Sequence, residues 1–196
     1  DIEFVASEMY KAYLDPSYKR NIEFKAMHKN KGVRYLEAIA NNVLNNPVVG
    51  GFVINFRDIT DKKLAEIDLN RYKHIVSSSS DHMIFIDNEY KILAANKAFL
   101  NDFCKDIEQV KDKKLYEIFG KNEFNSLLVN RCEMVKLGGQ AKIECWIDIP
   151  KSGKRFMEIS FYPYAEDNGK ITGIVINLRD NTEKYNMEKD IIEVQE

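Results

Sequence analysis

Two pairs of aspartate and threonine residues carry the clearest local chemistry in this sequence. Asp58 and Thr60 stand one residue apart after an apolar segment, and Asp180 and Thr182 repeat this arrangement near the end of the chain. A threonine at a helix start can accept a hydrogen bond from a free backbone N–H, which contributes about 1 kcal/mol. The aspartate can bond the same backbone or pair with a basic side chain. We therefore expect these four residues to hold two strand-to-helix junctions.

Cysteine and histidine are sparse. The cysteines are Cys104, Cys132 and Cys145, and the histidines are His28, His74 and His82. Neither set has a spacing typical of a metal site or of paired disulfides, so we expect reduced thiols, as in the cytosol. The histidines fall at a strand end, in a linker helix and before a strand, where surface or packing roles are the ordinary ones.

Sequence motifs of common enzyme sites are absent. The chain has no phosphate-binding glycine loop, no His-Glu-x-x-His and no Gly-x-Ser-x-Gly. The carboxylates of Asp102 and Asp106 are typical of a solvated helix face rather than of an acid–base pair. We expect no catalytic activity within this chain.

The composition is that of an ordinary globular domain, with 31% charged residues and a net charge of −2. Such a balance gives no electrostatic reason to expect binding to nucleic acid or to an anionic membrane. No apolar run approaches the roughly 20 residues that a membrane helix needs. There is no signal-peptide pattern, and we expect a cytoplasmic protein.

One segment of the chain occurs twice. Residues 51–62 and 173–184 are identical at eight of twelve positions, at a constant offset of 122. A period of this length suits one small domain rather than a solenoid repeat. The second copy has more than a hundred residues before it and the first has only about fifty. We therefore expect the first domain to lack its front half and the chain to be a fragment of a larger protein.

The hydrophobic pattern predicts an α+β protein. In the first part we expect a helix over 2–13, strands over 18–28, 32–44 and 48–58, and a helix over 61–78. In the second we expect strands over 83–87 and 90–95, an N-cap at Asn96, short helices over 97–120 and a longer helix over 121–137. Strands over 140–149, 154–164 and 170–180 and a helix over 183–196 complete the chain. Meanders of this kind are antiparallel, and the helices between the second and third strands must cover one face.

The order of these elements resembles a PAS (S-box) sensory domain. The resemblance rests on Asn-Lys-Ala-Phe-Leu at 96–100, on the closing Arg-Asp-x-Thr at 57–60 and 179–182, and on the hairpin sequences at 32–37 and 153–158. It implies a five-stranded antiparallel sheet with helices on one face, preceded by a three-stranded partial PAS domain. The implied division is a C-terminal PAS half over 1–60, a linker helix over 61–78, a complete PAS domain over 79–182 and the start of an exit signalling helix over 183–196.

The function that the resemblance implies is sensing and signal relay rather than catalysis. PAS domains lie upstream of histidine kinases, diguanylate cyclases and HD-GYP phosphodiesterases, and residues 188–195 are similar both to lead-ins of HD-GYP domains and to kinase linkers. We expect strain to pass through the Asp-x-Thr junctions to an effector in the same protein. The alternatives are a ligand-free dimerisation scaffold and a flavin- or haem-based redox or light sensor.

Neither haem nor a photoactive flavin is expected as a cofactor. Haem-binding relatives supply a histidine from the long helix before the third strand, and residues 121–137 contain none. Cys104 lies outside the reactive-cysteine motif of light-sensing relatives, and Leu178 stands where those relatives place a glutamine. Cys104 is better interpreted as a small buried side chain.

Between the sheet and its helices, either a filled core or a small apolar ligand site is compatible with the sequence. We expect this gap to be lined by Phe85, Phe99, Phe103, Phe119, Leu128, Ile143, Cys145, Phe161 and Leu178. Trp146 is expected on the outer face of the sheet beside Glu144, in interface packing.

Two surfaces favour a homodimer. One is the apolar seam of the flanking helices, at Ala65, Leu69, Tyr72 and Val76 and again at Met187, Ile191 and Val194. The other is the open sheet of the first domain, with an apolar face at Phe52, Ile54 and Phe56. The alternatives are that helix 61–78 packs on a sheet of its own chain, and that the open sheet packs against helix 2–13.

Overall fold

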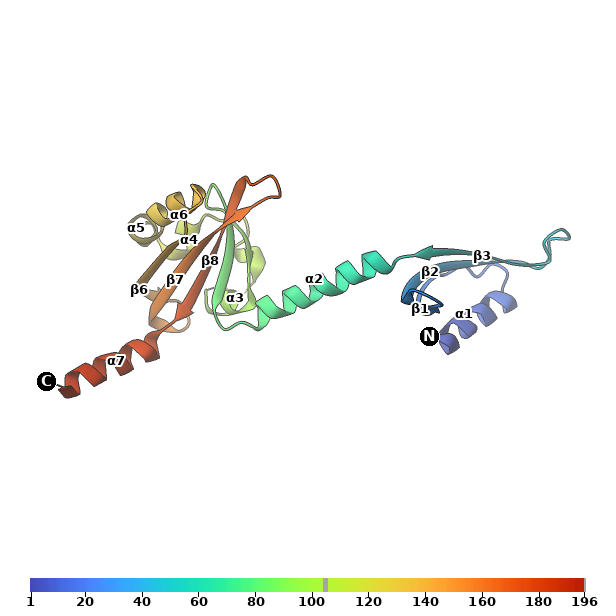
Figure 1. The fold of residues 1–196 in the computed structure, drawn as a ribbon, viewed down its shortest axis with the longest axis horizontal. Coiled ribbons are helices and arrows are strands. Elements are labelled where there is room, and N and C mark those ends of the chain that lie inside the picture. The colour runs from blue at the N-terminus through green and yellow to red at the C-terminus, as the bar shows by residue number, and fades with distance from the viewer. Residues whose placement is uncertain (104–105, 196) are drawn as a thin grey trace. The chain divides into compact units, whose positions relative to one another are not determined.

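The computed structural model describes residues 1–103 and 106–195 and divides the chain into two compact units, Asp1–Tyr72 and Lys73–Glu196. The boundary falls within the helix α2 (Thr60–Ser78). Along the chain, this helix follows the first sheet and precedes the second (Figure 1). None of the described helices is long and apolar enough to cross a lipid bilayer.

The first unit is a helix followed by a three-stranded antiparallel meander. Its elements are α1 (Ile2–Leu14), β1 (Asn21–His28), β2 (Gly32–Val43) and β3 (Gly51–Asp58). The strand order is β1-β2-β3, with Leu36 opposite Asp58 and Ala38 opposite Phe56. This is the predicted three-stranded sheet, with strand starts up to three residues later than the pattern suggested.

Helix α1 packs through Glu8 and Ala12, which are buried, while Ile2 and Tyr13 are exposed. Val5 and Met9 line the space between α1 and the sheet together with Glu8 and Ala12. The helix therefore faces the sheet with a stripe that is apolar except for Glu8.

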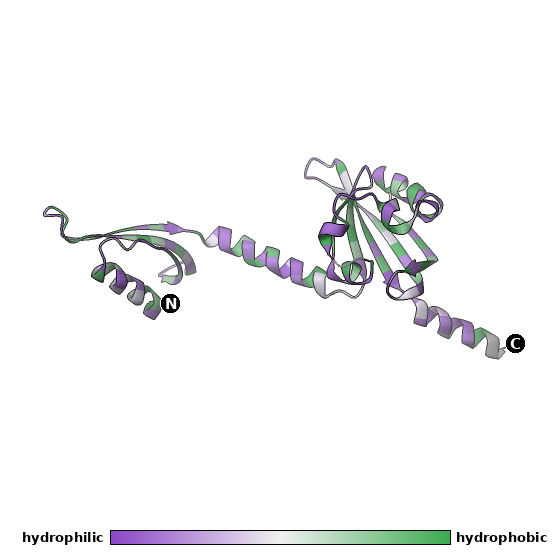
Figure 2. Cartoon of the chain, turned by 180° about the vertical axis from the view of Figure 1, so that it is seen from behind, coloured by the Kyte–Doolittle hydropathy of each residue, from purple (hydrophilic) through white to green (hydrophobic). Residues whose placement is uncertain are grey.

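The second unit contains the predicted five-stranded antiparallel sheet. Its strands are β4 (His82–Asp87), β5 (Ile92–Ala95), β6 (Ala141–Ile149), β7 (Gly153–Ala165) and β8 (Ile171–Asp180), in the order β5-β4-β8-β7-β6. Each strand pairs antiparallel with its neighbours. Figure 2 shows hydrophobic and hydrophilic residues alternating along these strands, as a sheet with one covered face requires.

Helices cover one face of this sheet (Figure 1). They are α3 (Lys97–Phe103), the 3₁₀ turn η1 (Ile107–Gln109), α4 (Leu115–Phe119), α5 (Lys121–Glu123), the π-helical turn η2 (Phe124–Leu128) and α6 (Val129–Lys136). The exit helix α7 (Thr182–Gln195) follows β8. The core between helices and sheet includes Ile84, Phe99, Cys132, Phe161 and Leu178.

The predicted single helix over 121–137 is interrupted. In η2 the backbone N–H of Val129 donates to the carbonyl of Phe124, five residues earlier. Phe124, Leu128 and Cys132 are buried on both sides of this widened turn. Apolar spacing is similar for an α-helix with and without such a turn, so the pattern could not reveal it.

Candidate functional site

Hydrogen bonds attach the start of α7 to two strands. Asp180 Oδ1 accepts from the backbone N–H of Thr182 at 2.8 Å and from the Thr182 hydroxyl. Thr182 Oγ1 accepts from the backbone N–H of Phe156 in β7 at 2.9 Å. The N–H of Asn181 donates to the carbonyl of Phe156 at 2.8 Å, and Arg155 Nε lies 3.8 Å from Asp180 Oδ2. The first turn of α7 is therefore held by β7 as well as by its own strand.

The junction between β3 and α2 repeats this geometry. The N–H of Thr60 donates to Asp58 Oδ1 at 2.9 Å, and Thr60 Oγ1 accepts from the N–H of Tyr35 in β2 at 3.0 Å. The N–H of Ile59 donates to the carbonyl of Tyr35 at 2.9 Å, and Arg34 Nη1 lies 4.0 Å from Asp58 Oδ2. The internal repeat thus extends from the sequence to the individual contacts.

The threonines bond differently from the helix caps that we expected. Each accepts a hydrogen bond from the strand paired with its own, β2 in the first unit and β7 in the second, and the aspartate accepts the bond from the helix start. A capping side chain belongs to the residue before the first helical one. Thr60 and Thr182 are themselves the first helical residues, and their oxygens bond the sheet. The junction therefore connects a strand to a helix rather than only closing the helix end.

The environment of Asp58 favours its charged form. The side chain of Thr60, followed by its backbone N–H, holds the pKa of Asp58 below the ordinary value. A carboxylate at this position also complements the partial positive charge at the start of α2. The junction is thus assembled with Asp58 ionised at neutral pH.

Asn96 joins the end of α2 to β4 and α3 within the second unit. Its Oδ1 accepts from the N–H of Met83 at 3.0 Å and from the N–H of Phe99 at 3.1 Å, which confirms the predicted N-cap. Its Nδ2 donates to the carbonyls of Val76 at 3.2 Å and Asp81 at 2.9 Å. One buried amide therefore joins α2, β4 and the first turn of α3.

Asp81 joins the segment after α2 to the strand before the exit junction. Arg179 Nη2 and Nε lie 3.0 and 3.1 Å from Asp81 Oδ2, and Asn177 Nδ2 lies 3.2 Å from the same oxygen. Arg179 immediately precedes Asp180 of the junction. The entry and exit of the second unit thus meet across a residue separation of 98.

His82 is a packing residue at the start of β4. It is buried, its Nε2 lies 2.8 Å from Asp102 Oδ2, and its ring meets the rings of Phe99 and Phe103 edge-on at 6.5 and 5.5 Å. Asp102, predicted on a solvated helix face, is thus the partner of this histidine.

Eight of the nine residues predicted to line the sheet–helix gap lie in or against the core, and Phe85 does not. The eight are Phe99, Phe103, Phe119, Leu128, Ile143, Cys145, Phe161 and Leu178. The prediction for Phe85 was wrong: Ile84 and Ile86 face the core, so Phe85 lies on the opposite face, 5.1 Å from the ring of Tyr164. The Met-Ile-Phe-Ile sequence is apolar at every position. Because it has no polar–apolar alternation, it does not show which residues point inward.

The aromatic side chains of the core pack directly on one another. The rings of Phe99 and Phe103 stack at 4.5 Å, and Phe103 meets Phe119 at 5.2 Å. A cavity of about 280 Å³ lies between the helices and β6, and its lining includes Phe119, Leu128 and Ile147. Two of the predicted lining residues therefore border a real cavity.

Trp146 lies on the outer face of β6, as expected, and its ring meets those of Phe156 and Tyr185 at 5.4 Å each. Tyr185 belongs to the first turn of α7. The outer face of the sheet thus contacts the exit helix through three aromatic rings.

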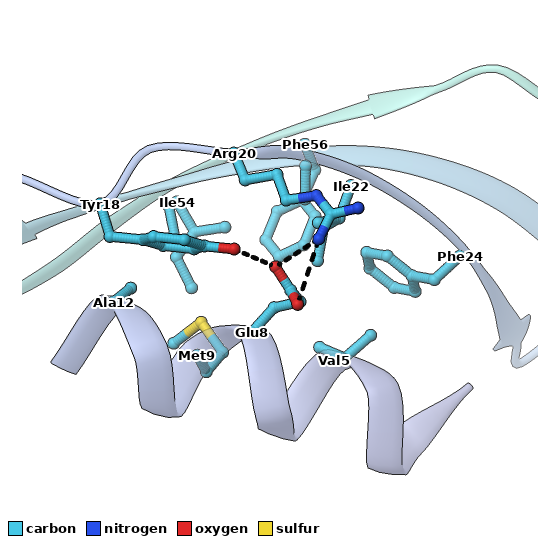
Figure 3. A pocket seen from close by; sticks show the side chains of 12 residues that line it. Val5, Glu8, Met9, Ala12, Tyr18, Arg20, Ile22, Phe24, Ile54 and Phe56 are labelled. Carbon is cyan, nitrogen blue, oxygen red and sulfur yellow. Dashed lines mark hydrogen bonds and ion pairs between the residues drawn. The ribbon is translucent and has the colours of Figure 1, made fainter. Parts of the chain in front are cut away.

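The first unit contains a second cavity, of about 140 Å³, between α1 and its sheet (Figure 3). Its lining is mostly apolar, but Glu8 is buried there. Glu8 accepts from Lys11 Nζ at 2.7 Å and from the Tyr18 hydroxyl at 2.6 Å, with Arg20 Nη1 at 3.5 Å. These bonds, from Lys11 first and Tyr18 second, lower the pKa of Glu8.

The described thiols are poor nucleophiles. Burial raises the pKa of Cys132 to about 12 and raises that of Cys145 as well. Cys104 lies outside the described residues.

Sequence reasoning missed Asp81 and Glu8. The recurrence of Asn-x-Arg at 55–57 and 177–179 could have drawn attention to Arg179 and hence to a carboxylate partner. No sequence signal marks Glu8, because an acidic residue on an amphipathic helix is ordinarily exposed.

Comparison with known proteins agrees with this architecture. A family model described as PAS domain matches residues 80–183, more than half of the chain. None of the curated proteins compared matches the sequence.

Solved structures share the fold at low sequence identity. A PAS domain from Colwellia psychrerythraea is 17% identical, with a TM-score of 0.51 over 59% of this chain and 98% of that one. The PAS domain of an HTR-like protein from Haloarcula marismortui is 15% identical, with a TM-score of 0.52 over 61% and 97%. The Vibrio cholerae VqmA dimer without target DNA is 15% identical, with a TM-score of 0.52 over 61% of this chain and 55% of that one. With the five-stranded sheet, its helical cover and the duplicated junctions already described, the match to the family model shows that this chain belongs to the PAS domain family.

Proposed function

We propose that the chain is a non-catalytic sensory and relay module of a cytosolic signalling protein, with the strand-to-helix junctions as its output. The single observation that carries the proposal is the duplicated junction. Thr60 and Thr182 are each the first residue of a helix and each bond the neighbouring strand of the sheet, β2 and β7. A shift of either neighbouring strand would therefore move the start of the helix.

The contacts of the second unit support a path from its entry to its exit. Asn96 bonds the last turn of α2 and the backbone of β4, and Asp81 bonds Arg179 beside the exit junction. A change in the direction of α2 would act on β4, then on β8 through this ion pair, and then on α7. An effector following α7 in the same protein, such as a histidine kinase, a diguanylate cyclase or an HD-GYP phosphodiesterase, would receive the change.

The test is a Thr182→Ala change in the full-length protein, with Thr182→Ser as the matched control. Loss of the hydroxyl should uncouple effector output from the stimulus, and serine should retain the coupling because it keeps the oxygen. Unchanged output in the alanine variant would show that the junction only stabilises the structure and does not transmit the signal.

Binding of a small ligand is a second candidate function. The observation that favours it is the cavity of about 280 Å³ bordered by Phe119, Leu128 and Ile147. Mass spectrometry of small molecules extracted from purified protein tests for such a ligand, and the absorption spectrum tests for flavin or haem. An extract without any stoichiometric small molecule would favour the ligand-free scaffold.

A homodimer through the flanking helices is part of the proposal. Leu69 and Tyr72 of α2 and Met187 and Ile191 of α7 are exposed, and helix seams of this kind associate in coiled coils. The neighbour VqmA is itself described as a dimer. Sedimentation at increasing concentration tests this part, and a monomer at high concentration would contradict it.

A further inference from the structure

The two strand-to-helix junctions share their backbone geometry but differ in one side-chain contact. At the offset of 122, Lys63 of α2 corresponds to Tyr185 of α7, and each is the fourth residue of its helix. The N–H of each donates to the carbonyl four residues earlier, at 2.9 Å in both helices. The chemistry of this one position therefore distinguishes two otherwise equivalent helix starts.

Charged groups hold the start of α2 against its sheet. Lys63 Nζ lies 2.6 Å from Glu23 Oε2 in β1 and 3.3 Å from Glu66 Oε2 in the same helix. The bond with Glu23, followed by that with Glu66, raises the pKa of Lys63. The lysine is therefore charged at neutral pH and links the first turn of α2 to β1 by an ion pair.

Aromatic rings hold the start of α7. The ring of Tyr185 lies 4.4 Å from that of Phe156 and 5.4 Å from that of Trp146. Trp146 pairs opposite Phe156 in the sheet, just as Lys25 pairs opposite Tyr35 in the first unit. Lys25 Nζ lies 5.4 Å from the centre of the Tyr35 ring. Two lysines and one ring in the first unit thus stand where the second unit has three rings.

Charged groups near the start of α7 are neutralised by other partners. Lys142 Nζ lies 2.8 Å from Glu158 Oε2, so this pair lies within the sheet. Glu158 accepts a further bond from the neutral amide of Asn181 at 3.3 Å. Among the described residues, neither Glu183 nor Lys184 of the first turn forms an ion pair with a strand. The first turn of α7 therefore meets its sheet through rings and uncharged groups.

We propose that salt loosens the first turn of α2 from its sheet and leaves the first turn of α7 attached, so that ionic strength acts selectively on the first junction. Attraction between exposed charges is screened over about 10 Å at 0.1 M salt and about 3 Å at 1 M. Contacts between aromatic rings depend on apolar area and ring geometry, which screening does not weaken. The inference specifies how the junctions are regulated, and it rests on the proposed relay only for its consequence in the effector.

Contacts that both junctions share limit the change. Thr60 keeps its bond from the N–H of Tyr35, and Ile59 is buried, so α2 loosens at its first turn without leaving the sheet. The ion pair of Arg34 with Asp58 has its counterpart in Arg155 and Asp180, at 4.0 and 3.8 Å. Screening acts on both of these pairs alike. A difference between the junctions therefore isolates the contact of Lys63.

The test measures exchange of the Lys63 and Tyr185 amide protons by NMR in the full chain, at 0.05 and 1 M sodium chloride. The two N–H groups make equivalent hydrogen bonds, so Tyr185 is the internal reference. We expect the exchange rate of Lys63 relative to that of Tyr185 to rise by a factor of about 1.5 to 5, which corresponds to the usual strength of an exposed ion pair.

Matched variants test the assigned contact. Glu23→Gln keeps the charge of Lys63 but removes its partner, so the response to salt should disappear. Lys63→Glu should reverse the response, because a carboxylate facing Glu23 and Glu66 is repelled most at low salt. Lys63→Glu combined with Glu23→Lys should restore the original direction.

Two outcomes would overturn the inference, whatever the effector does. One is a response of Lys63 equal to that of Tyr185, and the other is a response that persists in Glu23→Gln. Effector output in the full-length protein tests the relay separately. A salt response of Lys63 that Glu23→Gln abolishes, with effector output unchanged by salt, would support the inference and count against the relay.

Discussion

The side-chain oxygen of Thr182 lies 2.9 Å from the backbone nitrogen of Phe156 and accepts its hydrogen bond. Thr60 and Tyr35 reproduce this contact at 3.0 Å in the first unit. In each case the first residue of a helix is attached to the strand that neighbours its own, β7 for Thr182 and β2 for Thr60. A helix start with this attachment follows the sheet when the sheet moves.

Replacing Thr182 with alanine should destabilise the second unit by about 1 kcal/mol, because the partly buried N–H of Phe156 loses its acceptor. Serine should cost less, since it keeps the oxygen. Urea denaturation followed by the fluorescence of Trp146, the single tryptophan, reports on this unit. Equal stability of the alanine and wild-type proteins would show that water replaces the hydroxyl without loss.

Truncation of Leu178 and Phe56 to alanine should have unequal effects, although the two residues are equivalent in the repeat. Leu178 is fully enclosed, so its loss should cost roughly 2–5 kcal/mol. Phe56 is largely exposed, and its loss should cost less than about 1 kcal/mol. Tryptophan fluorescence follows the first variant and far-UV circular dichroism the second. A large loss at Phe56 would mean that β3 is covered in solution.

Alanine at Gly173 should disrupt the second unit, whereas alanine at Gly51 should be tolerated. The added methyl group at Gly173 would lie 2.7 Å from the Ile86 carbonyl oxygen. This is a backbone atom, so no change of side-chain rotamer can relieve the clash. Overpacking of this kind costs typically 1–3 kcal/mol. Thermal unfolding of the two variants side by side makes the comparison, and equal midpoints would contradict it.

Cys132 should resist alkylation in the folded protein. With its pKa raised to about 12, only about one thiol in ten thousand is ionised at pH 8, against roughly a quarter of free thiols. Peptide mapping after iodoacetamide treatment identifies the labelled cysteines. Treatment in denaturant is the control and should label Cys132 fully. Rapid labelling of Cys132 without denaturant would show that α6 opens readily.

The first unit should lose stability in acid partly through Glu8. Its folded-state pKa lies below the unfolded value, so its contribution is fully present above the unfolded pKa, about 4.3. The contribution is lost as the pH falls through the folded pKa. Glu8→Gln should therefore flatten the pH dependence of stability below about pH 5, as measured by circular dichroism. An unchanged slope in this variant would mean that other groups, such as Asp58, dominate the acid response.

The sequence by itself determined the order of the elements, the repeat and the places where strands turn into helices. These features depend on local signals. Alternating apolar residues, turn residues such as Gly153 and the recurring Asp-x-Thr act within a few positions of one another. The constant offset of 122 relates the residues of the two units from the sequence alone.

Only the tertiary structure decided which faces are covered and which distant groups meet. Phe85 points away from the core because its neighbours Ile84 and Ile86 take the inner face, a choice that an all-apolar strand leaves open. The burial of Glu8 depends on Tyr18 and Arg20 folding over α1. The pairing of Asp81 with Arg179, like the bond from Phe156 to Thr182, arises when the strands align, because local periodicity carries no information about partners so far apart in the chain.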